Sequence, residues 1–488
     1  MAKYPYEEKF GIIRAMPEKG RPRDEIIADL EWMGTEEDQF WRGGKVSGTM
    51  YCGDMEHYEF LGRAYQPFAH VNVLQRDICP SATKFESEII AMTLDLLHAE
   101  AVKQHHPDAR PCGSVTSGGT DSIVTAMLTY REWGRAEKGI TTPNVILPVT
   151  AHPAFDKGCH LFGIEPIKAP VDPVTTLVDL DFVREHINEN TVALVGSAGN
   201  YPYGTIDPIE ALSDLAVQHG IGLHVDGCLG GFILPWGQEL GYDIPVFDFR
   251  LPGVTTISAD THKYGYGLKG TSVLSYRSHD LRAHQYFTST DWQGGKYLSP
   301  GLAGSRSGGL IAATWASMVG LGREGYLKYA KAIFETAYEM QDAVKQHGEL
   351  AMMGSPTWCF SFTSDEFDIY HVNDSMRKHG WRFNGQQYPN AIHMCVTRPQ
   401  TQPGVVDAFR ADLAEGVAYG IEHKDEQPMS AAIYGGVPGG PTDEAGAFVR
   451  EIMISMLDDM QDVPELPAPA GAEDPKDVAA AGAAAADS

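Results

Sequence analysis

The sequence lacks three features that would each point to a particular class of protein. Its seven cysteines, an odd number in 488 residues, form no CxxC pair, which argues against a zinc ribbon or a disulfide framework and favours a reducing compartment. Binding to the phosphate backbone of a nucleic acid requires a basic protein face, and the net charge of −27 makes such a face improbable. We therefore expect no nucleic-acid partner. The longest apolar runs, such as Cys228–Trp236, are far shorter than the roughly 20 residues of a transmembrane helix, and the N-terminus lacks a signal peptide's apolar region. We therefore expect a cytoplasmic protein with no transmembrane segment and no metal site.

Short β-rich runs alternate with helical patterns through the middle of the chain. This alternation is typical of a mostly parallel sheet with crossover helices, so we predict an α/β fold. The predicted strands cover 144–150, 191–197, 221–226, 255–258 and 271–276, and the predicted helices cover 84–104, 154–163, 177–189 and 208–219.

Changes in composition divide the chain into four predicted parts. Residues 1–60 form an N-terminal arm without sustained periodicity, which we expect to pack on a second subunit, and residues 61–322 form the large domain. A smaller α+β domain covers 323–463, and a Pro- and Ala-rich tail, predicted to be disordered, covers 464–488. The small domain is predicted to hold a long helix over 323–347, strands over 359–363 and 391–397, and helices over 368–379 and 405–417.

A polar, glycine-rich stretch, SADTHKYGYGLKG (Ser258–Gly270), lies between two β-branched runs. The pattern predicts a strand, a turn that carries Lys263, and a second strand. A lone lysine in a loop is usually a surface residue. Beside His262, and among glycines that let the backbone approach a ligand, a buried lysine that loses its charge easily suits Schiff-base chemistry with an aldehyde.

A second small-residue turn, SGGT (Ser117–Thr120), ends a predicted strand and begins a helix. Free backbone N–H groups and the positive end of the helix dipole favour a phosphate at such a turn, and the Thr120 hydroxyl adds a donor. Taken alone, a Gly-Gly turn is usually only a turn.

Polar side chains also follow the carboxyl ends of other predicted strands, where ligands bind in parallel sheets. Together with the SGGT turn, His152, Asp226 and Lys263 fit pyridoxal 5'-phosphate: the lysine forms the Schiff base, the carboxylate keeps the pyridine nitrogen protonated, and a flat side chain covers the ring. Without Lys263, Asp226 would be interpreted as a strand-end turn residue, and His152 fits a structural role equally well.

At these residues the chain closely resembles the sphingosine-1-phosphate lyase family, which belongs to the fold-type-I pyridoxal-phosphate enzymes and is related to group II decarboxylases. The likeness runs from about Val46 to Tyr434, and the chain resembles the soluble bacterial members rather than the membrane-anchored eukaryotic ones. The matching stretches are VTSGGTDS (115–122), AHPAF (151–155), HVDGCLGGF (224–232), ISADTHKYGYGLKG (257–270), TDWQGGKYLSPGLAGSRSGG (290–309) and AAIYG (431–435).

The resemblance implies a role for each matching residue. Lys263 would be the Schiff-base lysine, with Asp226 on the pyridine nitrogen and His152 stacked on the ring. It also implies a homodimer with composite sites, in which Tyr51 and Ser305 serve the neighbouring subunit. The implied cofactor-phosphate residues are Gly119, Thr120, His262 and Ser305; the implied substrate residues are Tyr51, Lys269 and, closing the pocket, Tyr434. Arg306 either adds positive charge or pairs with a surface acid.

Two departures from the family pattern concern the substrate. The segment Asn72-Val73-Leu74-Gln75 stands where the family has Asn-Pro-Leu-His, so Gln75 replaces a histidine near the substrate phosphate. Glutamine donates a hydrogen bond but never carries positive charge. Tyr203 stands where many relatives have histidine.

The function that the resemblance implies is retro-aldol cleavage of a phosphorylated 2-amino-3-hydroxy compound, such as a sphingoid base 1-phosphate, to a fatty aldehyde and phosphoethanolamine. Either Lys263 or Tyr201 takes the 3-hydroxyl proton. The alternatives are an amino-acid decarboxylase and an aldolase for another hydroxy-amine. A non-catalytic homologue is disfavoured because Lys263 and Asp226 are both present.

Overall fold

The computed structural model describes residues 4–431, 435–436 and 443–463, and the chain divides into two compact units. The larger unit is Gln39–Gly436; the smaller is formed by the two ends of the chain, Met1–Asp38 and Val437–Ser488. The smaller unit holds α1 (Glu7–Phe10), most of α2 (Arg23–Arg42) and α16 (Asp443–Gln461). The predicted tail, 464–488, lies outside the described residues.

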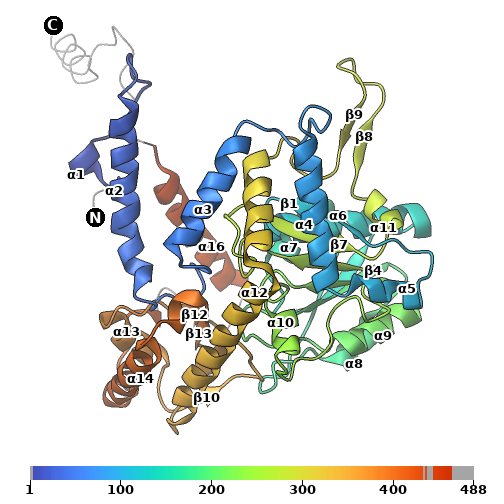
Figure 1. The fold of residues 1–488 in the computed structure, drawn as a ribbon. Coiled ribbons are helices and arrows are strands. Elements are labelled where there is room, and N and C mark those ends of the chain that lie inside the picture. The colour runs from blue at the N-terminus through green and yellow to red at the C-terminus, as the bar shows by residue number, and fades with distance from the viewer. Residues whose placement is uncertain (1–3, 432–434, 437–442, 464–488) are drawn as a thin grey trace, which may run out of the picture. The chain divides into compact units, whose positions relative to one another are not determined.

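A seven-stranded sheet in the order β1-β7-β6-β5-β4-β2-β3 forms the centre of the larger unit (Figure 1). All neighbouring strands are parallel except β7, which is antiparallel to both β1 and β6. The predicted α/β class with a mostly parallel sheet is therefore confirmed. The strands are β1 (Cys112–Thr116), β2 (Asn144–Pro148), β3 (Glu165–Ala169), β4 (Thr191–Ser197), β5 (Gly222–Asp226), β6 (Thr256–Ala259) and β7 (Ser272–Tyr276).

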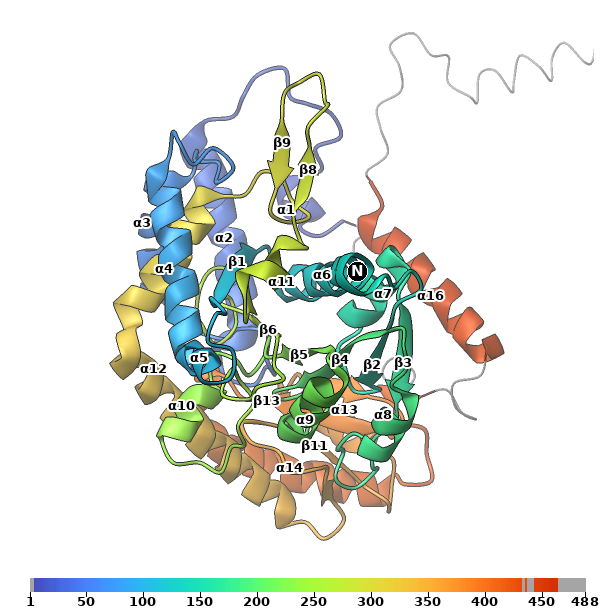
Figure 2. The same cartoon turned by 90° about the vertical axis from the view of Figure 1, so that its right-hand side faces the viewer.

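Helices cover both faces of this sheet, because its strands are apolar on both sides. Val145 of β2 is buried in one cluster with Phe155, whereas the next residue, Ile146, is buried in another cluster with Leu212. Figure 2 shows α6 and α7 on one face and α8 and α9 on the other. These helices are α6 (Gly119–Lys138), α7 (Ala154–Phe162), α8 (Leu180–His186) and α9 (Ile209–His219).

The small domain contains a four-stranded antiparallel sheet in the order β10-β11-β13-β12. The long helix α12 (Gly308–Lys345) leads into it and is interrupted at Gly322, whose φ of 56° and ψ of −178° are not helical. The predicted boundary between residues 322 and 323 coincides with this kink, and the domain limits stay predictions. The elements are β10 (Ala351–Met352), β11 (Cys359–Thr363), β12 (Asn384–Gln386), β13 (Ala391–Cys395), α13 (Tyr370–Lys378) and α14 (Val405–Glu422).

Several element predictions were wrong or incomplete. The predicted helix over 84–104 is divided, because α4 (Pro80–Leu96) ends before His98, which adopts a left-handed φ of 53°. Helix α12 begins at Gly308 rather than 323, and the first 60 residues contain α2 and α3 (Met55–Tyr65). Strand β3 and the hairpin of β8 (Phe287–Ser289) and β9 (Tyr297–Ser299) were not predicted, since few of their residues are buried and they carry little hydrophobic pattern. The remaining helices are α5 (Val102–His105), α10 (Leu234–Glu239) and α11 (His279–Ala283).

None of the helices in the described part of the chain is long and apolar enough to cross a lipid bilayer.

Candidate active site

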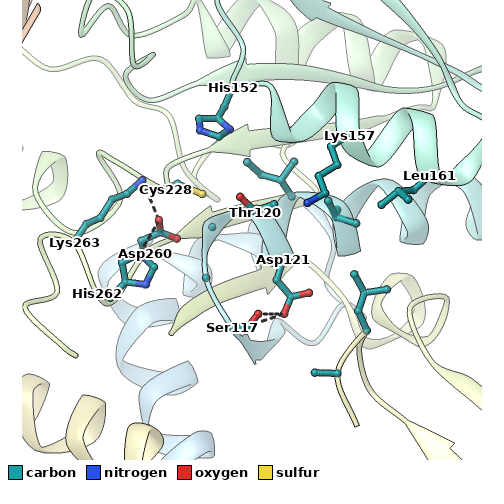
Figure 3. Close-up of a pocket in the computed structure, with 16 residues that line it drawn as sticks. Ser117, Thr120, Asp121, His152, Lys157, Leu161, Cys228, Asp260, His262 and Lys263 are labelled. Atoms are coloured by element: carbon teal, nitrogen blue, oxygen red, sulfur yellow. Dashed lines mark hydrogen bonds and ion pairs between the residues drawn. The ribbon is translucent and has the colours of Figure 1, made fainter. Parts of the chain in front are cut away.

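A cavity of about 530 Å³ lies at the carboxyl ends of the central strands (Figure 3). It brings together the SGGT turn after β1, His152 after β2 and Lys263 after β6, as predicted for ligand sites in parallel sheets. The site lining also includes Asp121, Lys157, Cys228, Asp260 and His262.

The turn after β1 presents the start of a 20-residue helix to the cavity. A Cβ at Gly119 would lie 2.7 Å from Asp260 Oδ2 and 3.0 Å from Cys228 Sγ, so only glycine fits there. Gly118 has a φ of 147°, which also favours glycine. The first turn of an α-helix has backbone N–H groups without intrahelical partners, and these suit a phosphate.

Lys263 is held by a carboxylate that the sequence analysis did not single out. Its Nζ lies 3.0 Å from Oδ2 of Asp260, a residue only 2 % exposed. Burial is the largest single effect and lowers the pKa of Lys263, but Asp260, Tyr51 and Cys228 together raise it, and the net pKa lies above the ordinary value. The expectation that this lysine loses its charge easily is therefore wrong for the free amine.

His262 lies on the other side of the same carboxylate, with Nε2 3.6 Å from Asp260 Oδ2. Burial lowers the pKa of His262, and the nearby Lys269 and Lys263 lower it further against the opposing effect of Asp260. Two buried atoms here, His262 Nδ1 and Asp260 Oδ1, have no hydrogen-bond partner among the described residues. Such unsatisfied atoms beside a helix N-terminus indicate that a polar ligand completes the site.

Asp226 ends β5 and is 8 % exposed. Its Oδ1 accepts hydrogen bonds from the Cys228 backbone N–H at 3.0 Å and from the Ser258 hydroxyl at 3.2 Å. Asp226 does not itself line the cavity, but it is hydrogen-bonded to the lining residue Cys228. These two bonds fix a buried carboxylate in one orientation, as a partner for a ring nitrogen requires.

A second buried carboxylate, Asp207, lies within electrostatic reach of Asp226 and was not predicted. Asp207 is 1 % exposed, and its Oδ2 accepts the Ser197 backbone N–H at 2.7 Å. Burial raises the pKa of Asp207 to about 7, and the charge of Asp226 adds to this effect. Sequence patterns gave no signal for it, because its role depends on burial between two strand ends.

His152 lines the cavity with an exposed ring. Its Nδ1 accepts the Ala154 backbone N–H at 3.1 Å, so the neutral ring carries its proton on Nε2. The contact fixes the imidazole at the start of α7, where Figure 3 shows it across the cavity from His262. Lys157, on the same helix, also points into the cavity and was not predicted.

Tyr51 and Lys269 lie together, within electrostatic reach of Lys263 of the same chain. Lys269 Nζ is 4.6 Å from the centre of the Tyr51 ring, and the charge of Lys263 lowers the pKa of Tyr51 against the larger effect of burial, which raises it. The expectation that Tyr51 reaches across a dimer is therefore corrected. Its segment is anchored to the chain's own small domain, since the Thr397 hydroxyl donates to the Met50 carbonyl at 2.9 Å.

Lys269 has an unusually low pKa for a lysine. Burial lowers the pKa of its ammonium to about 8, and the neighbouring Lys263 ammonium lowers it in the same direction. An ammonium next to the Tyr51 phenol and near Lys263 suits a substrate phosphate.

Asn72, Gln75 and Ser305 form a separate group that does not line the cavity. Asn72 Nδ2 donates to Ser305 Oγ at 2.9 Å, and Gln75 is exposed. Arg306 does not face the cavity either: its guanidinium lies 2.7 Å from Glu86, so it forms an ion pair, although with a buried acid rather than a surface one.

Tyr201 lies on the loop after β4 and is 45 % exposed. Burial raises the pKa of the Tyr201 phenol, and the charge of Lys263 lowers it by a smaller amount. The two side chains are therefore within electrostatic reach of each other. Tyr434, the predicted pocket-closing residue, lies outside the described residues.

The residues present fit pyridoxal 5'-phosphate. An amine, a flat imidazole and a helix N-terminus line one cavity, the buried Asp226 carboxylate accepts a hydrogen bond from the lining residue Cys228, and His262 Nδ1 is a free polar atom near the turn. Each is a group that this cofactor requires from its protein.

Comparisons with known proteins agree with this fit. The family model described as the pyridoxal-dependent decarboxylase conserved domain matches residues 5–361. The chain is 43 % identical over 438 residues to the sphingosine-1-phosphate lyase of Arabidopsis thaliana, covering 88 % of this chain and 78 % of the plant protein. It is 35 % identical over 388 residues to a probable sphingosine-1-phosphate lyase of Legionella pneumophila, covering 77 % and 62 % of the two chains.

Solved structures show the same relationship. A structure of the sphingosine-1-phosphate lyase of Burkholderia pseudomallei matches with a TM-score of 0.89 and 58 % identity, covering 94 % of this chain and 100 % of that chain. A glutamate decarboxylase of Lactobacillus brevis matches with a TM-score of 0.71, covering 85 % of this chain and 97 % of that chain; at 17 % identity it shows the fold alone.

Proposed function

Because the chain belongs to the sphingosine-1-phosphate lyase family of pyridoxal-dependent enzymes, we propose that it cleaves the Cα–Cβ bond of a phosphorylated 2-amino-3-hydroxy compound such as a sphingoid base 1-phosphate. The products are a fatty aldehyde and phosphoethanolamine. The observation that carries the proposal is the 58 % identity, over 94 % of this chain, with a bacterial sphingosine-1-phosphate lyase.

Six residues in or next to the cavity have proposed parts in this reaction. Pyridoxal 5'-phosphate, when bound, accepts the electron pair of the broken bond into its ring. Lys263 holds the cofactor aldehyde, Asp226 keeps the ring nitrogen protonated, and His152 covers one face of the ring. Gly119, Thr120 and His262 bind the cofactor phosphate.

The carboxylate of Asp260 determines the protonation of Lys263 once the substrate amine has replaced it. The ammonium, 3.0 Å from Oδ2, stays protonated and is the proton donor to Cα after bond cleavage. Tyr201 is the proposed base that takes the 3-hydroxyl proton as the Cα–Cβ bond breaks. Burial raises the pKa of its phenol, and the nearby Lys263 charge opposes part of that rise. Lys263 and Tyr201 thus divide the acid and base roles.

Lys269 and Tyr51 are the proposed binding groups for the substrate phosphate. The Lys269 ammonium lies 4.6 Å from the centre of the Tyr51 ring, so the two side chains provide two hydrogen-bond donors to one anion. The ammonium also provides positive charge. A substrate amino acid with a carboxylate and no phosphate gains less from this pair.

We also propose a cytoplasmic homodimer in which Ser305, Asn72 and Gln75 serve the partner's site. Support comes from the hydrogen bond that links Asn72 to Ser305, and from the family resemblance, which implies that Ser305 serves the cofactor phosphate of the neighbouring subunit.

Product analysis of the purified, cofactor-loaded protein tests this function. We expect a long-chain aldehyde from a sphingoid base 1-phosphate, and no carbon dioxide from glutamate or aromatic amino acids. Release of carbon dioxide without aldehyde would instead support the decarboxylase alternative.

A further inference from the structure

The loop that carries Tyr201 is bound to the sheet of the small domain. The Pro202 carbonyl, one residue after Tyr201, accepts hydrogen bonds from two side chains of that sheet. Ser361 Oγ of β11 donates at 2.5 Å, and Gln386 Nε2 of β12 donates to the same oxygen. A carbonyl oxygen has two lone pairs, and both are used here.

The Tyr201 ring itself rests on a buried histidine of the same sheet. The ring centres of Tyr201 and His393 are 4.5 Å apart, and His393 of β13 is fully buried. Burial lowers the pKa of His393 to about 3, so the ring is neutral at ordinary pH. Its Nε2 contacts Cys359 Sγ at 2.8 Å, which holds the ring in place.

Backbone contacts make this loop a closed unit. Asn200 N–H donates to the Thr205 carbonyl at 2.8 Å, and Gly204 N–H donates to the Asn200 carbonyl at 2.9 Å. Gly204 also packs so closely that a Cβ there would lie 1.9 Å from the Cys359 carbonyl oxygen of β11. Because the loop is closed on itself, a shift at Pro202 moves Tyr201 with it.

We propose that Ser361 and Gln386 are positioning residues: by binding the Pro202 carbonyl, they hold the neighbouring Tyr201 in the position near Lys263 from which it reacts. The inference rests on the proposed function, because it gives Tyr201 a role in proton transfer. Through these two hydrogen bonds, the small domain sets the position of a reacting group that belongs to the large domain. A misplacement of about 1 Å can cost on the order of 10²-fold in rate, so the effect on turnover is measurable.

The test compares Gln386→Leu, Ser361→Ala and the double variant, each as cofactor-loaded enzyme. We expect the double variant to lose about 10- to 100-fold in kcat, with KM and the visible absorbance of the Lys263-bound cofactor nearly unchanged. Adding Tyr201→Phe should cause little further loss, and Ser361→Thr, which keeps the hydroxyl, should retain turnover.

Gln341→Leu is the matched control. Gln341 is 3 % exposed and donates from Nε2 to the Thr357 carbonyl at 2.5 Å, a bond that does not involve the Pro202 carbonyl. This variant should lower the melting temperature without changing kcat. Wild-type kcat in the double variant, or a loss that multiplies fully with that of Tyr201→Phe, would overturn the proposal.

Hydrogen exchange separates this inference from the proposed function. In cofactor-loaded protein without substrate, the backbone amides of 199–201 and 203–205 should exchange faster in the double variant than in wild type or Gln341→Leu. Unchanged exchange refutes the positioning role whatever the substrate is. Failure of the wild type to cleave a sphingoid phosphate refutes the proposed function and leaves the exchange result as the deciding test of the loop contacts.

Discussion

Lys269 gives the proposed phosphate site a pH dependence of predictable sign. Burial and the Lys263 charge lower its pKa to about 8, so the ammonium is present at neutral pH and is lost as the pH rises through 8. A hydrogen bond from a charged donor contributes about 1.5–3 kcal/mol; although burial affects the ammonium, the Lys269 side chain as a whole is exposed, and solvent screening favours the lower limit. About 1.5 kcal/mol corresponds to roughly tenfold in affinity.

The assay is KM for a sphingoid base 1-phosphate from about pH 6.5 to about pH 9.5, a range that brackets the Lys269 pKa. We expect the wild-type KM to rise about tenfold across the range. Lys269→Gln should show the high KM throughout, and Lys269→Arg should keep the low KM, because arginine stays charged. The kcat should change little, since Lys269 contacts the phosphate and not the reacting carbons.

Lys328→Gln, an exposed lysine of α12 without this environment, is the control and should follow the wild type. A wild-type KM in Lys269→Gln, or a pH dependence that persists in that variant, would refute the assignment of Lys269 to the phosphate.

Four further predictions test other parts of the site. Lys263→Ala should abolish turnover and the visible cofactor absorbance while thermal unfolding stays cooperative; near-normal activity would overturn the assignment of the Schiff-base lysine. Mixed dimers of Lys263→Ala and Tyr51→Phe chains should show no rescue, because both residues lie in the site of one chain; restored activity would show that Tyr51 crosses the dimer after all. Gln75→His should lower KM for the phosphorylated substrate roughly fivefold at mildly acidic pH, where histidine is charged, and an unchanged KM would place Gln75 away from the phosphate. Burial raises the pKa of Asp207 to about 7, so the folded protein binds a proton at this carboxyl more tightly than the unfolded chain does. The wild-type free energy of unfolding should therefore fall as the pH rises from about 4 to about 7, by up to about 4 kcal/mol. Asp207→Asn should lack that fall in denaturant titrations, and the same pH dependence in both proteins would contradict the raised pKa.

The sequence predicted those parts of the site that depend on strand ends. Lys263, His152 and the SGGT turn follow separate strands, and the topology of a parallel sheet brings them to one cavity. Periodicity located β4 and β11 to the residue, because both have apolar residues bounded by turn signals.

What the sequence did not predict depends on contacts between distant segments. Asp260 is three residues from Lys263, yet its importance appears only when burial places its carboxylate 3.0 Å from the amine. The position of Tyr51 follows from hydrogen bonds between residues near 50 and residues near 397, a separation that no local pattern reports. Helix α2 escaped prediction because charged residues are interspersed along it and Trp41 is its only buried residue.

The central claim is tested most directly by one measurement, the products formed from a sphingoid base 1-phosphate by the purified enzyme. The account predicts stoichiometric fatty aldehyde and phosphoethanolamine, formed by the wild type and not by Lys263→Ala. Faster turnover of the corresponding non-phosphorylated amine, or aldehyde formation that persists in Lys263→Ala, would contradict it.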